Sequence, residues 1–356
     1  MVVVVVMVAA CAVLVGISYL MLDILSGMVV APKTPVREVE SAGELVLPTA
    51  GGEVLDLEVC GDGRLLAVLE SPTGSATSLL RVFDLSRVGE AVLERETGAR
   101  GVAWVGDSRR LVYEDGGDIR LLDAETGEEV RLTSGPEVDY DPLPSPDGRF
   151  ILWTRSKGEG RPGSAAQMWV MDSESGEAEM LAPRAELAAW DPAGGRVASR
   201  GRGYLAEGSG GSEYYLQVAT RGRQGWEYLA SCKEEPLFLW WPRLDKTLYV
   251  AAWRPSDQAA TRAVWFEVGD TGEEKKAASS ESLGDDAARY RFYPSRRMAR
   301  VAYIGDKGLE YLDYDAGRIY RFTRVSAACP LAWDEAGNGI LYCGEGGICR
   351  VALPGG

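Results

Sequence analysis

Short apolar strands alternate with polar turns along this chain, and the same phrase returns at intervals of roughly 40–50 residues. Its clearest copy is the turn Ser145-Pro146-Asp147-Gly148 followed by the apolar run Phe150–Trp153. Proline, aspartate and glycine are the residues that a tight turn needs. The apolar run predicts a β-strand that packs one face on a neighbour. The pattern therefore predicts repeated strand-turn-strand units.

A second phrase is an apolar strand that ends in an acidic turn with glycine. Its copies are Val82–Leu85, Leu121–Glu128, Val170–Glu177 and Tyr311–Gly317. An aspartate in such a turn accepts hydrogen bonds from nearby backbone N–H groups. We expect this role for the turn aspartates, which are Asp84, Asp123, Asp147, Asp172 and Asp313. Together the two phrases give about four short strands per unit, which is typical of propeller blades.

The predicted fold is all-β, a β-propeller of about seven four-stranded blades over residues 44–356. The last unit is short, and Glu44–Pro48 can supply its missing outer strand and so close the ring. A ring of six blades, with residues 44–54 as an irregular lead-in, is the alternative.

The copies of the turn phrase, above all the segment Asp139–Trp153, resemble the TolB-like branch of the WD40-like propellers. The resemblance covers roughly residues 44–354. It implies a propeller that serves as a protein-binding platform or that gates a peptidase domain. No peptidase domain follows the repeats in this sequence.

The N-terminal run Val2–Leu22 is uncharged and almost wholly apolar. About 20 such residues span a bilayer as a helix, so residues 1–31 are predicted to be a single transmembrane anchor and residues 32–43 an extended linker. A cleaved signal peptide, or lipidation at Cys11, is the alternative. The basic Lys33 and Arg37 favour a cytoplasmic propeller, whereas the cysteines described next favour an extracytoplasmic one.

Three cysteines lie close together near the C-terminus, at Cys329, Cys343 and Cys349. Hairpins centred near Ala336 and Gly346 would place Cys343 opposite the other two, within disulfide range. Buried thiols or a metal site are alternatives, although the spacing matches no zinc motif. A disulfide would require an oxidising compartment, so the propeller is expected on the extracytoplasmic side of a membrane.

Composition excludes several functions. The formal net charge is −15, which argues against nucleic acid as a partner. The chain has no histidine, so it cannot hold a Ser-His-Asp triad, histidine-ligated haem or the usual catalytic zinc set. No phosphate or dinucleotide motif is present, and no cofactor or metal is expected. Interblade packing is expected for the fifth unit's tryptophans, Trp240, Trp241, Trp253 and Trp265.

The segment Asp139-Tyr140-Asp141 begins an inner strand, where the central channel of a propeller opens. It is the candidate site for a ligand or partner, with a structural hydrogen-bond network as the alternative. The sequence thus predicts a membrane-anchored, non-catalytic propeller that binds a protein partner as a scaffold. A carboxylate-dependent hydrolase or a ligand-binding propeller with a site in the channel is the alternative, and a structural subunit of a membrane assembly is a third possibility.

Overall fold

The structure is a computed structural model. It describes residues 34–48, 52–87, 89–156, 166–202, 214–221, 226–232, 235–243, 246–253, 262–269, 274–279, 292–305, 307–325, 328–334 and 336–354. Residues 34–356 belong to one compact unit, separate from residues 1–33. The predicted anchor Val2–Leu22 lies outside the described residues. Within them, no helix is long and apolar enough to cross a membrane.

The strands of this unit form seven sheets, each built mainly from strands that are consecutive in the chain. The first three sheets contain β3 (Glu53–Val59), β4 (Leu65–Ser71), β5 (Ser78–Asp84) and β6 (Ala91–Thr97); β7 (Val102–Trp104), β8 (Arg110–Asp115), β9 (Asp118–Asp123) and β10 (Glu129–Arg131); and β11 (Val138–Pro144), β12 (Phe150–Ser156), β13 (Gln167–Asp172) and β14 (Ala178–Pro183). The next two contain β15 (Ala185–Trp190), β16 (Arg196–Arg202), β17 (Tyr214–Thr220) and β18 (Trp226–Cys232); and β19 (Phe238–Arg243), β20 (Lys246–Trp253), β21 (Arg262–Gly269) and β22 (Glu274–Ser279).

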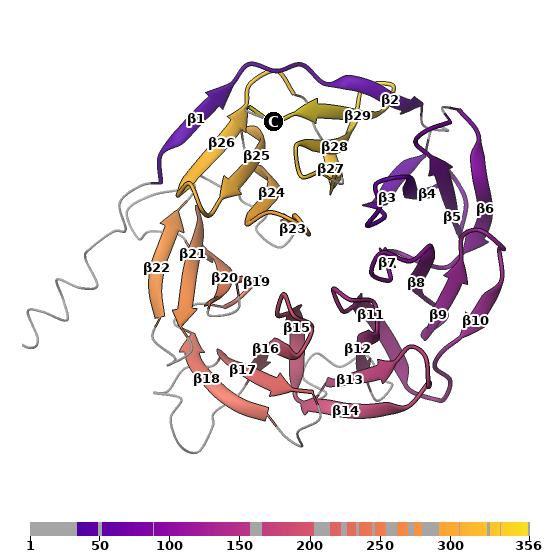
Figure 1. Ribbon diagram of the computed structural model, residues 1–356, viewed down its shortest axis with the longest axis vertical. Coiled ribbons are helices and arrows are strands. Elements are labelled where there is room, and N and C mark those ends of the chain that lie inside the picture. Colours follow the sequence, from indigo (N-terminus) through magenta and orange to yellow (C-terminus); the bar gives the residue numbers. More distant parts are fainter. Residues whose placement is uncertain are drawn as a thin grey trace, which may run out of the picture. The chain divides into compact units, whose positions relative to one another are not determined.

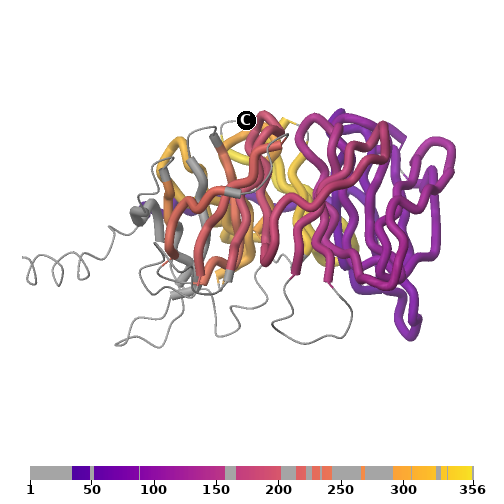
Figure 2. Tube along the Cα trace, turned by 90° about the horizontal axis from the view of Figure 1, so that it is seen from below, coloured from indigo at the N-terminus to yellow at the C-terminus, as the bar shows by residue number. Residues whose placement is uncertain are grey.

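The last two sheets each include a strand from the N-terminal side of the ring. The sixth contains β1 (Val36–Val39), β26 (Arg318–Phe322), β25 (Gly308–Asp313), β24 (Arg300–Gly305) and β23 (Phe292–Pro294), and the seventh contains β2 (Glu44–Pro48), β29 (Gly347–Ala352), β28 (Gly339–Gly344) and β27 (Ala328–Trp333). The sheets stand around a central axis, with the first strand of each unit innermost (Figure 1). From the side, the strands run between the two faces of the ring (Figure 2). The prediction of an all-β propeller is confirmed.

The turn phrase folds as its residues predict. In its best copy, Ser145 Oγ donates to Asp147 Oδ1 at 2.5 Å and accepts from the N–H of Phe150 at 2.9 Å. Asp147 Oδ1 also accepts from the N–H of Arg149, and Gly148 has a φ of 72° that glycine tolerates. The second phrase behaves likewise, because Asp123 and Asp172 each accept two backbone N–H groups of their turns.

An ion pair joins the two phrases within a unit, and neither phrase predicts it by itself. The arginine after the first turn pairs with the aspartate that ends the third strand. The pairs are Arg64–Asp84, Arg149–Asp172 and Arg300–Asp313, with N–O distances of 2.8, 3.2 and 2.9 Å. These pairs hold the two hairpins of a sheet in register on one face of the ring.

Neighbouring sheets pack through apolar faces, as the tryptophans of the fifth unit illustrate. Trp240 packs with Phe292 and Val301 of the sixth sheet, whereas Trp241 packs with Ala198 and Leu216 of the fourth. Both indoles are buried. The predicted interblade role of Trp240 and Trp241 is confirmed, and the side chains of Trp253 and Trp265 lie outside the described ones.

The segment predicted as a plain linker over residues 32–43 contains a strand. β1 runs parallel to β26, with Val36 opposite Ile319 and Val39 opposite Phe322. The chain then reaches β2, which pairs antiparallel with β29. We call residues 34–48 the N-terminal strap, because they add the outer strands of two adjacent sheets.

The predicted alignment of Cys343 with Cys349 is wrong by one position. The hairpin of β28 and β29 pairs Gly344 with Gly347, so Cys349 faces Tyr342 and Cys343 faces Ile348. Adjacent residues of a strand point to opposite faces, so these two thiols cannot reach one another. Cys343 faces Ala328 rather than Cys329 on the other side, and the Cys329 side chain lies outside the described ones.

Candidate functional site

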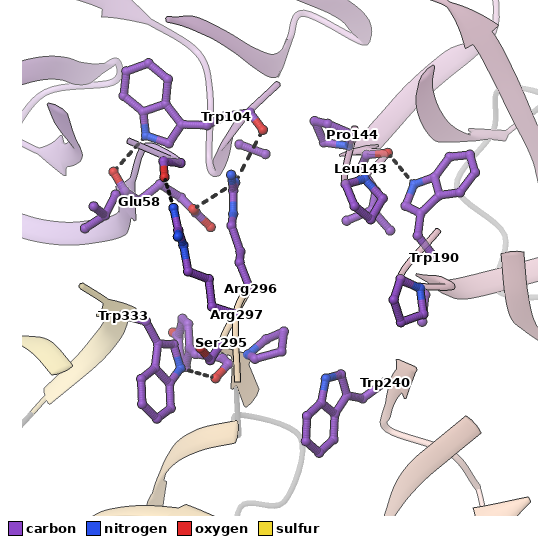
Figure 3. Close-up of a pocket in the computed structure, with 18 of the residues that line it drawn as sticks. Glu58, Trp104, Leu143, Pro144, Trp190, Trp240, Ser295, Arg296, Arg297 and Trp333 are labelled. Carbon is purple, nitrogen blue, oxygen red and sulfur yellow. Dashed lines mark hydrogen bonds and ion pairs between the residues drawn. The ribbon is translucent and has the colours of Figure 1, made fainter. Parts of the chain in front are cut away.

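A cavity of about 840 Å³ occupies the central channel. Its wall is formed by the C-terminal ends of the innermost strands of all seven sheets and by the turns that follow them. Figure 3 shows its side chains, among which Glu58, Arg296 and Arg297 lie close to Trp104. The cavity is of the size that small-molecule sites have.

Three tryptophans at equivalent positions tie neighbouring inner strands together. Trp104, Trp190 and Trp333 each donate their indole N–H to a backbone carbonyl of the preceding sheet, at 2.9, 3.0 and 2.7 Å (Figure 3). All three indoles are at least nine-tenths buried. They fix the shape of the channel wall and present little ring surface to a ligand.

These hydrogen bonds also show which residues are equivalent around the wall. The accepting carbonyls belong to Glu58, Leu143 and Tyr293, so these three residues occupy the same position on β3, β11 and β23. The corresponding residue on β7 is Ala103, and Glu58 is therefore an acid at a position that is otherwise filled by uncharged side chains.

The environment of Glu58 changes its acidity. Burial within the ring raises the pKa of Glu58 to about 7, Arg296 opposes this rise, and the nearby Asp56 adds to it. The side chain keeps 35% of its surface exposed, because it borders the cavity. A carboxyl enclosed by the ring yet open to the channel can exchange protons near neutral pH.

The cation nearest to Glu58 comes from the sixth sheet, which is separated from the first by the seventh (Figure 1). Arg296 lies in the turn after β23, and its guanidinium donates to the carbonyls of Gly106 and Trp104 at 3.2 and 3.3 Å. Its Nη2 lies 3.7 Å from Oε2 of Glu58. The adjacent Arg297 donates to the carbonyl of Gly61 at 3.1 Å. Both arginines therefore reach across the channel toward the first two sheets (Figure 3).

Cys60 also lines the cavity, but its role is structural. Its thiol donates to Asp62 at 2.6 Å and accepts from the N–H of Leu65 at 3.0 Å, as Ser145 does in its own turn. Burial, together with the hydrogen bond to Asp62, raises the pKa of the Cys60 thiol. A thiol kept protonated in this way is a poor nucleophile.

The predicted ligand segment Asp139-Tyr140-Asp141 does not contribute to this cavity, whose wall on β11 begins at Leu143. Asp139 is buried and accepts from Nε and Nη2 of Arg155 on β12, at 2.6 and 2.7 Å. Asp141 is exposed, with a φ of 52° at the bulge of β11. Asp139 therefore belongs to a structural hydrogen-bond network, which was the alternative prediction for this segment.

This difference gives a direct prediction. Asp139→Asn should lower the free energy of unfolding by about 2 kcal/mol, because it leaves the partly buried Arg155 without its carboxylate. Asp141→Asn is the matched control and should cost less stability than Asp139→Asn, because Asp141 is exposed and asparagine tolerates positive φ. Urea unfolding of both variants measures the difference, and equal stability of the two would contradict it.

No protein-family model matches the chain, and no curated protein matches it. Solved structures do match. An oligogalacturonate lyase in complex with manganese has a TM-score of 0.65 at 13% identity, over 89% of this chain and 97% of that one. The oligogalacturonate lyase from Vibrio parahaemolyticus has a TM-score of 0.62 at 13% identity, over 89% and 98%. The tricorn protease has a TM-score of 0.57 at 13% identity, over 80% of this chain and 33% of that one.

At this identity the likeness shows the fold alone. It confirms the resemblance to TolB-like propellers as far as the propeller fold, and membership of that family stays a prediction. It also overturns the expectation of a non-catalytic scaffold and of a protein that is not an enzyme. That expectation took a propeller without a peptidase domain to be a binding platform, yet nearly the whole chain of a named lyase has this fold.

The manganese named for one lyase structure has no matching ligand set in the described part of this chain. There, no three Asp, Glu or Cys side chains are placed to hold a metal ion, and the chain has no histidine.

Proposed function

We propose that this propeller is a carboxylate-dependent enzyme whose active site is the channel cavity. Glu58 is the proton donor and acceptor, and Arg296 is the cation beside it. The observation that carries the proposal is a single carboxyl with a pKa of about 7, placed 3.7 Å from a guanidinium in a cavity large enough for a small molecule. Perturbed carboxyls in clefts are candidate catalytic groups.

The two groups suit a reaction in which one proton moves. A carboxyl with a pKa near the working pH can take a proton as a base and return it as an acid. Arg296 is held by two carbonyls, so it is oriented to stabilise negative charge that develops on a substrate. Of the other two acids in the wall, Asp334 is already paired with Arg350 at 2.5 Å, which leaves Asp107 as the second carboxylate that a hydrolysis would need.

The first test is turnover by the 356-residue chain on small substrates with cleavable C–O bonds. Oligogalacturonate comes first, because it is the substrate named for the lyases of the same fold. We expect a rate that depends on pH with an apparent pKa near 7, and the loss of this rate in Glu58→Gln. Binding without turnover would support the ligand-binding alternative. If none of the substrates is bound or turned over, the proposal is contradicted.

We also propose that the seven sheets are the seven blades of one ring, closed by Glu44–Pro48 on β29. The pairing of β2 with β29 and the ring of inner strands support this. The membrane anchor and the extracytoplasmic location stay predictions.

Deletion of residues 1–31 tests the anchor. Because residues 34–356 form a compact unit of their own, the shortened chain should be soluble and β-rich, with its melting temperature unchanged. The full chain should partition into membranes or detergent. Circular dichroism and membrane fractionation measure both, and an insoluble, unfolded product would rule out a separable anchor.

A further inference from the structure

We infer that one side of the channel cavity is a subsite for an uncharged apolar group of the substrate, next to the reacting bond. The inference rests on the proposed function for the position of the reacting bond, and it adds the chemical class of the group that the rest of the cavity receives. It is carried by the distribution of charge around the wall, by the shortage of hydrogen-bond donors on one side, and by the position of Glu58 on the other.

The described cavity wall has its charged side chains on one side. They are Glu58 of the first sheet, Asp107 of the second, Arg296 and Arg297 of the sixth, and Asp334 of the seventh. These four sheets are consecutive around the central axis (Figure 1). Among the described side chains, those that line the cavity from the third, fourth and fifth sheets include no charged group. We call this side the apolar arc, and its residues are Leu143–Pro146, Ala188–Trp190, Pro192 and Phe238–Pro242.

The apolar arc is uncharged although acids lie next to it in the sequence. Asp191 stands between Trp190 and Pro192, yet it is buried and pairs with Arg196 at 3.3 Å. Asp147 follows Pro146 and accepts a hydrogen bond from Ser145 within its own turn. Neither aspartate lines the cavity. The fold therefore keeps these charges out of this part of the wall.

The apolar arc is also poor in hydrogen-bond donors. The Ser145 hydroxyl donates to Asp147, and the indole N–H of Trp190 donates to the carbonyl of Leu143. Four residues of the arc are prolines, which have no backbone N–H: Pro144, Pro146, Pro192 and Pro242. A sugar on this side would bury hydroxyl groups that lack partners, at a cost that an apolar group avoids.

The surface of the apolar arc can be reached from the cavity. Leu143, Ala188 and Phe238 are half-buried there, and Pro192 is exposed. Leu143 and Ala188 pack on the buried apolar cluster that lies between the third and fourth sheets, so the core holds them from behind. An apolar group that covers this surface removes it from water, which favours binding.

The two sides of the cavity face one another. Figure 3 shows Leu143 and Trp190 on one side, with Glu58 and Arg296 on the other. An apolar group seated on the apolar arc would therefore direct an attached polar bond toward Glu58. A cavity of about 840 Å³ is large enough for a ring and such a polar end. We expect substrates of this kind to be turned over faster than oligogalacturonate, a chain of charged sugars.

Two uncharged rings of similar size test the class of the group. Cyclohexanol has an apolar ring, whereas myo-inositol carries a hydroxyl group on every ring carbon. Ligand-observed NMR titration of the 356-residue chain should show cyclohexanol binding at least about tenfold tighter than myo-inositol.

Leu143→Asn places an amide of similar size in the apolar arc. It should weaken cyclohexanol binding by at least about fivefold without weakening that of myo-inositol. Leu121→Asn is the matched control, because Leu121 is also a half-buried leucine packed on an apolar cluster but lies outside the cavity wall. It should keep the full preference for cyclohexanol.

Circular dichroism confirms that each variant is folded. If Leu143→Asn is unstable, Pro192→Ser decides the question, because Pro192 is exposed in a turn and its replacement should lower the preference for cyclohexanol by about threefold.

The inference is overturned if neither ring binds, if myo-inositol binds as tightly as cyclohexanol, or if a folded Leu143→Asn keeps the preference. These outcomes are separate from the proposed function. Turnover that depends on Glu58 without a preference for apolar rings would retain the enzyme and remove the subsite. A preference that depends on Leu143 without any turnover would retain the subsite and remove the enzyme.

Discussion

Deleting residues 34–48 should destabilise the whole ring rather than fray one edge. The N-terminal strap supplies the outer strand of the seventh sheet and extends the sixth. Leu47 is only 3% exposed and belongs to one apolar cluster with Leu57 and Leu66 of the first sheet and Ile348 of the seventh. The strap therefore covers the seam between the last sheet and the first.

The expected loss is about 5 kcal/mol of unfolding free energy, from several apolar side chains at about 1.5–3 kcal/mol each. We expect the melting temperature to fall by roughly 10 °C and the exposed edge of β29 to promote association. Calorimetry and light scattering measure these effects. The control is deletion of residues 1–31, which keeps the strap. Equal melting temperatures for the two deletions would show that the ring does not depend on the strap.

The turns and the strand that closes the seventh sheet could be predicted from the sequence, because both depend on local chemistry. Ser-Pro-Asp-Gly admits few other conformations, and a sheet one strand short leaves an edge that a nearby apolar strand can cover. The parallel strand β1 carries no such local signal. Val36–Val39 alternates with charged residues after a proline, and only its packing on β26 makes it a strand.

The position of the cysteines shows a different limit. The prediction placed the centre of the last hairpin at Gly346, whereas the structure centres it between Glu345 and Gly346. A shift of half a residue in the centre of a hairpin exchanges the two faces of a strand. Because Cys343 and Cys349 cannot bond, this pair gives no reason to expect an oxidising compartment.

The candidate site could not be located from the sequence because its parts are far apart along the chain. Glu58 and Arg296 come from opposite ends of the repeat array, and only the closed ring brings them together. Two signals were nonetheless present. Glu58 is acidic where the equivalent residues Ala103 and Leu143 are not, and Arg296-Arg297 replaces a typical turn pair. Comparing the repeats position by position would have found both, whereas Asp139 stood out only because it belongs to the best copy.

Glu58→Gln should reduce turnover by at least about 100-fold and yet stabilise the protein above neutral pH. The loss of rate follows from removing the one group to which the proposal assigns proton transfer, since general acid–base groups contribute about 10²–10⁴ in rate. Glutamine keeps the size of the side chain and cannot exchange a proton. The gain in stability follows from the raised pKa, because the ring disfavours the ionised form.

The direction of this pH dependence is fixed by linkage. The pKa of Glu58 is raised from 4.5 to about 7 in the folded chain, so between these values the folded state binds more protons than the unfolded state. Wild-type stability should therefore fall as the pH rises through this window, relative to Glu58→Gln. The full shift would correspond to more than 3 kcal/mol, but solvent in the channel screens a side chain that is 35% exposed.

We accordingly expect Glu58→Gln to be about 1–2 kcal/mol more stable than the wild type at pH 8 and equal to it at pH 4.5. Urea unfolding at both pH values measures this without a substrate. Glu94→Gln is the matched control, an exposed glutamate on β6, and should show no difference between the two pH values. A Glu58→Gln variant whose stability parallels that of the wild type from pH 4.5 to pH 8 would mean that Glu58 titrates normally, which would remove the physical basis for its role in proton transfer.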